Sequence, residues 1–100
     1  MADKEIDNEA KIEIQLEPDI LKGVYANVTN VGHTQEEFLI DFLFIQRQPA
    51  PFGKLVSRII VTPDHAKRIH SALAENIRKY EDQFGKLDMD PSVSTNQTIQ

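Results

Sequence analysis

The alternation of apolar and polar residues predicts four β-strands along the first two thirds of the chain. Residues 11–17 (KIEIQLE) alternate strictly and residues 24–31 alternate more loosely, which is the period of a strand with one buried face. Residues 37–46 and 54–61 are instead apolar at nearly every position, which is typical of strands covered on both faces. Because the connections between these segments are short, we expect a four-stranded antiparallel meander.

Residues 62–85 carry the signals of one long α-helix. Thr62 is a good N-cap residue, Pro63 suits the first helical position, and Gly85 suits the end of a helix. The apolar residues between them recur at steps of three and four and form one stripe: Ala66, Ile69, Leu73, Ile77, Tyr80 and Phe84. The predicted fold is therefore α+β, a four-stranded antiparallel β-meander followed by one long C-terminal helix packed on one sheet face.

The predicted helix covers only one face of this sheet, whereas residues 37–46 and 54–61 are apolar on both faces. The face left open carries the candidate interface, which comprises Leu39, Asp41, Leu43, Ile45, Val56, Arg58 and Ile60. An exposed apolar surface marks an association site, and association is a usual remedy for a small core. We therefore expect a homo-oligomer, with a dimer as the first choice, and a protein partner as an alternative.

Asp41 and Arg58 are the polar residues on this otherwise apolar face. A hairpin that is symmetric about its loop places them nearly opposite each other. We therefore expect a cross-strand ion pair that fixes the register of the two strands. A pair that anchors a ligand is the alternative hypothesis.

The composition limits the chain to one small domain. It has 100 residues and no cysteine, which excludes a disulfide scaffold and a thiolate metal site. The acidic residues 1–10 and the aperiodic residues 88–100 predict a disordered arm and a disordered tail around a domain at 11–87. The N-terminus lacks the pattern of a secretory signal, and the longest apolar run, residues 38–45, is too short to cross a bilayer. We expect a cytoplasmic protein.

The net charge of −5 conceals a basic segment between acidic ends. Residues 47–79 carry seven basic and two acidic side chains, a formal charge of +5. The candidate nucleic-acid contacts in this segment are Arg47, Lys54, Lys67 and Arg68. Binding of single-stranded nucleic acid is therefore the second hypothesis. Opposite charges four residues apart on the helix favour a solvated helix face instead.

The sequence carries no catalytic or metal-binding pattern. His65 and His70 are five residues apart and point to different sides of a helix, so they do not chelate a metal together. Ser57 lies inside a predicted strand rather than at a glycine-flanked elbow, and no glycine-rich phosphate loop occurs. We therefore expect neither a cofactor nor enzyme activity.

Six short motifs together form a recognisable pattern. They are YAN at 25–27, F-x-x-D-F at 38–42, SRI at 57–59, P-x-HAK at 63–67, NI at 76–77 and YE-x-x-FG at 80–85. The pattern resembles a family of short bacterial, archaeal and phage proteins known only as a domain of unknown function. The resemblance implies a small prokaryotic-type protein and supplies no activity.

The predicted order of four strands and a helix is also that of single-stranded nucleic-acid binders of the Whirly, PUR and coactivator-four type. It resembles, more distantly, that of SecB-type chaperones. The first hypothesis is a non-enzymatic, self-associating module for protein interaction or assembly. Nucleic-acid binding is the second hypothesis, and a chaperone-like holder of unfolded chains, which needs an open apolar groove, is the third.

Overall fold

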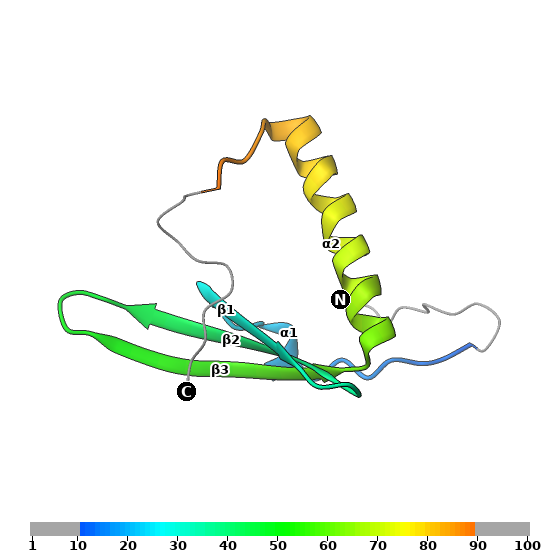
Figure 1. Ribbon diagram of the computed structural model, residues 1–100, viewed down its shortest axis with the longest axis horizontal. Helices are drawn as coiled ribbons and strands as arrows, with labels where there is room; N and C mark the ends of the chain where they lie inside the picture. Colours follow the sequence, from blue (N-terminus) through cyan, green and yellow to red (C-terminus); the bar gives the residue numbers. More distant parts are fainter. Residues whose placement is uncertain (1–10, 90–100) are drawn as a thin grey trace.

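The structure, a computed structural model that describes residues 11–89, is a small antiparallel sheet followed by one long helix (Figure 1). Its elements are α1 (Pro18–Leu21), β1 (Val28–His33), β2 (Phe38–Gln46), β3 (Phe52–Val61) and α2 (Pro63–Phe84). The strands form one sheet in the order β1-β2-β3, with both pairs antiparallel. The predicted α+β class, the antiparallel sheet and the C-terminal helix are confirmed.

The sheet has three strands, so the prediction of a strand at residues 11–17 is wrong. This segment belongs to no strand, and only Ile14 and Leu16 in it are half-buried. Its last residue, Glu17, accepts a hydrogen bond from the backbone N–H of Leu21 (3.0 Å), at the turn of α1. Alternation in a sequence shows that a segment would have one apolar and one polar face as a strand, but it does not show that another strand pairs with it. A strand forms only where its N–H and C=O groups find a ladder partner.

β1 begins at Val28 rather than at Val24, because the side chain of Asn27 ends the pairing with β2. The Asn27 amide donates to the backbone O of Ile45 and accepts from the backbone N of Ile45, both at 2.9 Å. The side chain thus takes the place of a neighbouring strand at this point. The preceding residues leave the sheet, and the ring of Tyr25 meets Phe44 edge-on with centroids 6.1 Å apart.

A β-bulge interrupts the pairing of β2 with β3. Phe42 lies opposite Ser57, whereas the next residue of β2, Leu43, lies opposite Leu55, so Val56 is the extra residue. Side chains alternate along a strand, and an extra residue moves everything before it to the other face. Leu55 therefore shares a face with Leu43. Unbroken alternation along the strand would instead place Leu55 on the face of Ser57 and Ile59.

The two faces of the sheet differ in polarity. The phenylalanine face comprises Phe38, Ile40, Phe42, Phe44 and Gln46 of β2, Thr29, Val31 and His33 of β1, and Phe52, Lys54, Ser57, Ile59 and Val61 of β3, with Lys54 at its hairpin end. The ion-pair face comprises Leu39, Asp41, Leu43 and Ile45 of β2, Val28 and Asn30 of β1, and Leu55, Arg58 and Ile60 of β3. The phenylalanine face has no charge in its middle, whereas the ion-pair face has two.

Local signals fix both ends of α2 where they are predicted. The Thr62 hydroxyl accepts a hydrogen bond from the N–H of His65 (3.2 Å), and Pro63 occupies the first turn. Gly85 ends the helix with φ of 101°, a conformation that residues with a side chain rarely adopt, and its N–H donates to Glu81 O (2.9 Å).

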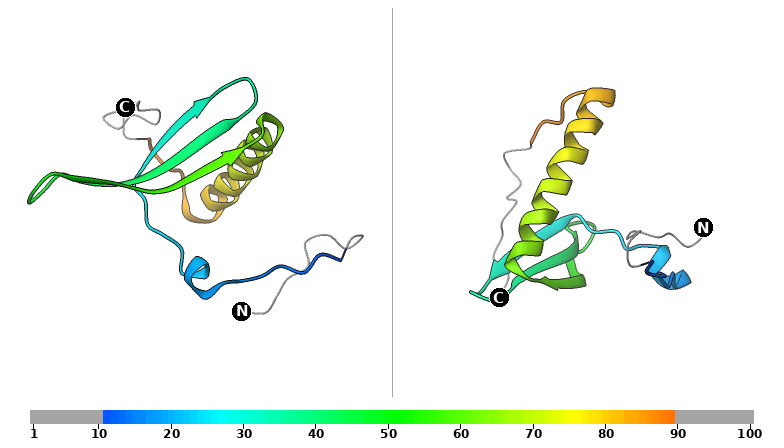
Figure 2. Two further views of the ribbon diagram at one scale, coloured as in Figure 1. Left: turned by 90° about the horizontal axis from the view of Figure 1, so that it is seen from below. Right: turned by 90° about the vertical axis from the view of Figure 1, so that its right-hand side faces the viewer.

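The structure does not show the predicted packing of the helix on one face of the sheet. α2 leaves the end of β3 steeply and stands away from the strands (Figures 1 and 2). Ala66 and Ile69 are half-buried, but every residue from His70 to Tyr80 is exposed, and α2 has no buried residue.

The described structure has almost no core of its own. Leu43, 8% exposed, is the one apolar side chain that is buried within residues 11–89. The stripe of α2 and much of the sheet are therefore open to solvent. The predicted disordered arm at 1–10 lies outside the described residues, as does most of the predicted tail at 88–100.

Candidate association surface

The apolar stripe of α2 faces solvent along most of its length. Leu73 is 59% exposed and Phe84 65% exposed, and Ile77 and Tyr80 between them are also exposed. The rings of Tyr80 and Phe84 contact each other, with centroids 5.0 Å apart. The stripe is thus a continuous apolar strip rather than a set of scattered side chains, which is the form that an association surface takes.

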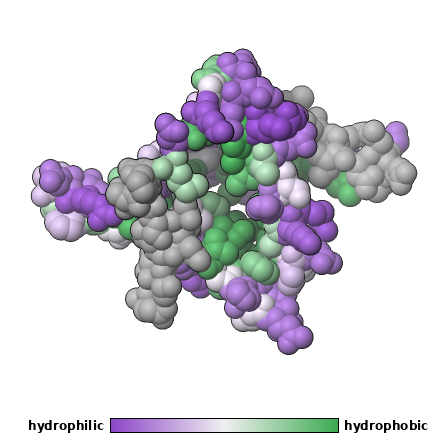
Figure 3. Space-filling view, turned by 45° about the horizontal axis from the view of Figure 1, so that its top comes forward, coloured by the Kyte–Doolittle hydropathy of each residue, from purple (hydrophilic) through white to green (hydrophobic). Residues whose placement is uncertain are grey.

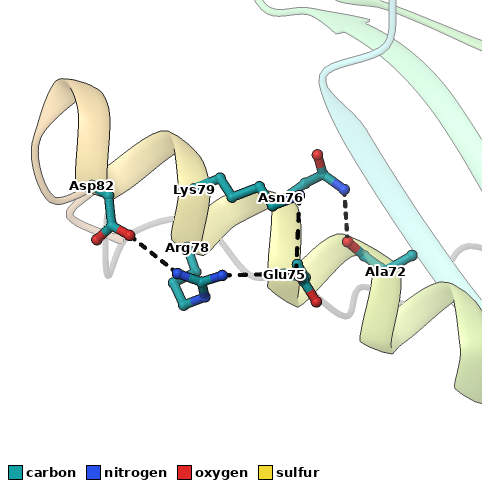
Figure 4. Close-up of polar contacts among 6 residues, drawn as sticks. All are labelled: Ala72, Glu75, Asn76, Arg78, Lys79 and Asp82. Atoms are coloured by element: carbon teal, nitrogen blue, oxygen red, sulfur yellow. Dashed lines mark hydrogen bonds and ion pairs between the residues drawn. The ribbon is translucent and has the colours of Figure 1, made fainter.

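The opposite side of α2 is polar and internally paired (Figure 4). Arg78 contacts Asp82 at 3.1 Å and Glu75 at 3.7 Å, and Lys79 lies 3.9 Å from Glu75. Two of these exposed pairs, Arg78–Asp82 and Lys79–Glu75, have the four-residue spacing that the sequence predicts, and each pair adds little stability. They identify the solvent-facing side of the helix, in contrast to the apolar stripe on its other side.

The phenylalanine face of the sheet is the apolar surface beside this helix. Its Val31 and Ile59 are exposed, and the ring of His33 stacks on Phe38 with centroids 5.2 Å apart. Apolar side chains of the helix and of the sheet look toward each other across a hollow (Figure 3). The two surfaces come together at the base of α2, where Phe38 and Ala66 line one shallow depression.

Six of the seven predicted interface residues lie together on the ion-pair face. Leu39 lies opposite Ile60 and Asp41 opposite Arg58, while Leu43 and Ile45 continue the same row of β2. The seventh, Val56, is the bulge residue and has no residue opposite it. Asp41 and Leu43 are buried, whereas Ile60 is 53% exposed. The role of these residues in an interface stays a prediction.

Asp41 and Arg58 form the cross-strand ion pair that the sequence predicts. Arg58 Nε donates to Asp41 Oδ1 at 2.7 Å, and Arg58 Nη2 donates to Asp41 Oδ2 at 2.9 Å. Both carboxylate oxygens are engaged by one guanidinium, which favours the register role over ligand anchoring. These hydrogen bonds hold the pKa of Asp41 below its ordinary value, against the opposing effect of burial, and they raise the pKa of Arg58.

The lowered pKa of Asp41 makes the stability of the fold depend on acid. A carboxyl whose pKa is lower in the folded state stabilises the fold at pH values above its unfolded pKa of 3.8, and that contribution is lost as the pH falls through the folded pKa.

We expect the Asp41→Asn variant to unfold more easily than the unmodified chain at pH 7, and to lose less stability as the pH is lowered from 5. Urea unfolding at a series of pH values measures this. Asp19→Asn, which changes a 95% exposed side chain, is the control and should follow the unmodified chain. If the free energy of unfolding fell equally below pH 5 in Asp41→Asn and in the unmodified chain, the role of the pair would be contradicted.

The four predicted nucleic-acid contacts do not form one patch. Arg47 and Lys54 lie at the hairpin end of the sheet, whereas Lys67 and Arg68 lie at the base of α2. β2 separates the two ends by about 27 Å, from its length of nine residues. A ligand that contacts all four must run along the sheet.

The structure adds little to the possibilities for metal or membrane binding. Among residues 11–89, no three side chains of the His, Cys, Asp and Glu types lie where they could together hold a metal ion. The same part of the chain has no helix that combines the length and apolar character needed to span a membrane.

Two features of the surface escape the sequence pattern. The phenylalanine face is not predicted as an open surface, because the pattern assigns the helix to it. The two hydrogen bonds between the Asn27 side chain and the Ile45 backbone join positions far apart in the chain. The YAN motif, which contains Asn27, is the one sequence feature that marks this position.

Comparison with protein families identifies the family of the chain by a match over most of its length. The model of the family described as "Protein of unknown function (DUF3467)" matches residues 1–89, and this confirms the resemblance to a domain of unknown function. No curated protein and no solved structure matches the chain. The match includes the sheet, α2 and the motifs on them, and it brings no activity with it.

Proposed function

Because the chain belongs to the DUF3467 family of unknown function, its identity supplies no activity, and we propose from its surface that it is a self-associating module. The module is non-enzymatic and serves protein interaction or assembly. The observation that carries this proposal is the exposed apolar stripe of α2, from Leu73 to Phe84.

An uncovered helix of this kind is poorly stabilised in water. Most of the stability of a protein helix comes from packing its apolar side, and α2 has 22 residues and no buried side chain. Covering Leu73, Ile77 and Phe84 would contribute about 1–2 kcal/mol each, since a fully buried side chain of this size contributes about 1.5–3 kcal/mol. A partner surface therefore stabilises the helix as well as binding it.

The sheet also lacks the packing that would stabilise it. A small sheet is independently stable when it packs an apolar face against another element, and within residues 11–89 neither helix packs along a face of the sheet. Leu43 alone is buried among the apolar side chains of residues 11–89. The helix and the sheet of one chain are therefore two open surfaces that association can cover together.

Sedimentation velocity of the full chain tests self-association. We expect a dimer or a larger species at micromolar concentration, and we expect the fraction of monomer to increase on dilution. A single monomeric species at all concentrations would overturn the proposal.

Binding of single-stranded nucleic acid is the second candidate, and one observation favours it. The phenylalanine face lies between the two basic pairs, and aromatic rings between cations are the usual platform for stacked bases. The likeness to four-stranded nucleic-acid binders, however, loses support because the sheet has three strands.

A salt titration with labelled single-stranded DNA and RNA separates the two candidates. Salt-sensitive retention that is lost in the Lys54→Glu and Lys67→Glu variants would favour nucleic-acid binding. We expect no retention at low salt.

A further inference from the structure

The junction between the sheet and the helix is a single residue. β3 ends at Val61 and α2 begins at Pro63, so Thr62 alone connects them. A residue before proline is held in extended conformations, and Thr62 has φ of −71° and ψ of 159°. Its hydroxyl also caps the helix through the N–H of His65. The direction in which α2 leaves the sheet is therefore set locally.

This junction keeps the stripe of α2 away from the phenylalanine face of its own sheet. Ala66, in the first turn, comes near Phe38, but the helix then diverges, and Leu73 and the residues beyond it are exposed (Figures 1 and 3). The stripe and the phenylalanine face form the two sides of an open wedge. We call this the apolar wedge.

The two sides of the apolar wedge match in length. From Ala66 to Phe84 the stripe rises about 27 Å, at 1.5 Å per residue. β2 spans about the same distance. The steps along the stripe average the 3.6 residues of a straight helix, rather than the 3.5 of a supercoiled pair. The stripe is thus straight and about as long as one strand of the sheet.

We propose that two copies exchange their helices, so that the stripe of each α2 lies on the phenylalanine face of the other copy. This inference rests on the proposed function and names its surface. A short, rigid hinge favours such an exchange, because the helix cannot fold back while its apolar side still needs a cover.

The area of the surfaces points to a second copy as the occupant. A helix of 22 residues is about 33 Å long and 10 Å wide, so one helix on one sheet covers roughly 330 Å². Reciprocal exchange uses the helix and the sheet of each copy and doubles this to roughly 660 Å². That is near the 800 Å² or so that each partner buries in a stable complex. An unrelated helix in the wedge would leave α2 of this chain half covered.

The phenylalanine face suits the exchanged helix better than the ion-pair face does. Arg58 is half exposed and would lose water beneath an apolar stripe. The middle of the phenylalanine face offers Phe42, Ile40 and Ile59, none of which carries charge. Exchange also fills the wedge, and it therefore leaves no open groove there for a chaperone-like holder.

Lengthening the hinge tests the exchange. Insertion of Gly-Ser-Gly-Ser between Val61 and Thr62 lets α2 turn back onto its own sheet. We expect the dimer dissociation constant to rise at least 100-fold while the helix content by circular dichroism is kept. The same insertion after Ala50, in the hairpin loop, is the matched control and should leave the dimer intact. A dimer of unchanged affinity after the hinge insertion would overturn the exchange.

Cross-linking tests the same contact without altering the hinge. The chain has no cysteine, so introduced thiols are unique. Ser57→Cys on the phenylalanine face and Leu73→Cys on the stripe are placed in separate copies with tags of different mass, mixed, and treated with a short bismaleimide. We expect a cross-linked pair of unlike copies, and none when Glu75→Cys replaces Leu73→Cys. Ala74→Cys, at the side of the stripe, is the second choice if Leu73→Cys folds poorly.

The outcomes separate the two levels of the proposal. A dimer by sedimentation without the Ser57–Leu73 cross-link would reject the exchange and leave self-association standing. A cross-link within one chain carrying both cysteines, and none between copies, would show that α2 folds back on its own sheet. A monomer throughout would reject both the exchange and the proposed function.

Discussion

Replacement of Leu73 by Asp is expected to raise the dimer dissociation constant roughly 1000-fold. Leu73 lies at the middle of the stripe and is 59% exposed in the single chain. A charge buried at the centre of an interface costs about 2 kcal/mol or more, and a two-fold dimer carries the change twice, about 4 kcal/mol in all. Sedimentation equilibrium measures the loss. Because α2 depends on its partner for stability, we expect the helix content to fall with the dimer.

The control for Leu73→Asp is Ser71→Asp, on the polar side of the same helix. It adds the same charge two residues away and should leave the dimer within a factor of about two, as exposed substitutions usually do. Equal weakening by both variants would show that charge on the helix, rather than the stripe, is responsible. No weakening by Leu73→Asp would remove the stripe from the interface.

Replacement of Leu43 by Ala is expected to lower the free energy of unfolding by about 2–3 kcal/mol. Leu43 is the apolar side chain that residues 11–89 bury, and truncation of a buried Leu costs about 2–5 kcal/mol. We expect the lower end of this range, since a thin sheet relaxes easily around the lost atoms. Urea unfolding measures the change, at one protein concentration because association and stability are linked.

Val24→Ala is the matched control for Leu43→Ala. Val24 is 68% exposed and lies before β1, so its truncation should change the free energy of unfolding by less than about 0.5 kcal/mol. Comparable losses in the two variants would contradict the placement of the core at Leu43.

The parts of the fold that local signals determine are those that the sequence predicts correctly. The ends of α2 depend on Thr62, Pro63 and Gly85, each of which acts on its own helix terminus. The hairpin of β2 and β3 is also local, and its loop together with the bulge at Val56 sets Asp41 opposite Arg58. These features follow from residues close together in the chain.

The errors concern distant neighbours. Residues 11–17 alternate like a strand, but alternation does not supply a ladder partner. The bulge at Val56 moves Leu55 to the other face without any change in the apolar pattern of the strand. The start of β1 depends on Asn27 reaching Ile45, which periodicity does not reveal.

The largest difference lies in the packing of α2. The sequence shows correctly that the helix has an apolar side and that the sheet has two apolar faces. It leads to the expectation that a helix covers the sheet of its own chain. The single-residue junction at Thr62 prevents this, and the phenylalanine face becomes a candidate surface beside the predicted ion-pair face.

Amide hydrogen exchange of α2 at several protein concentrations tests the central claim most directly. The claim is that a second copy covers the stripe from Ile69 to Phe84. It predicts that amides in this part of α2 exchange slowly when the protein is concentrated and rapidly when it is diluted below the dissociation midpoint. Amides of α2 that exchange at the same rate at every concentration, while sedimentation shows the dimer dissociating, would contradict it.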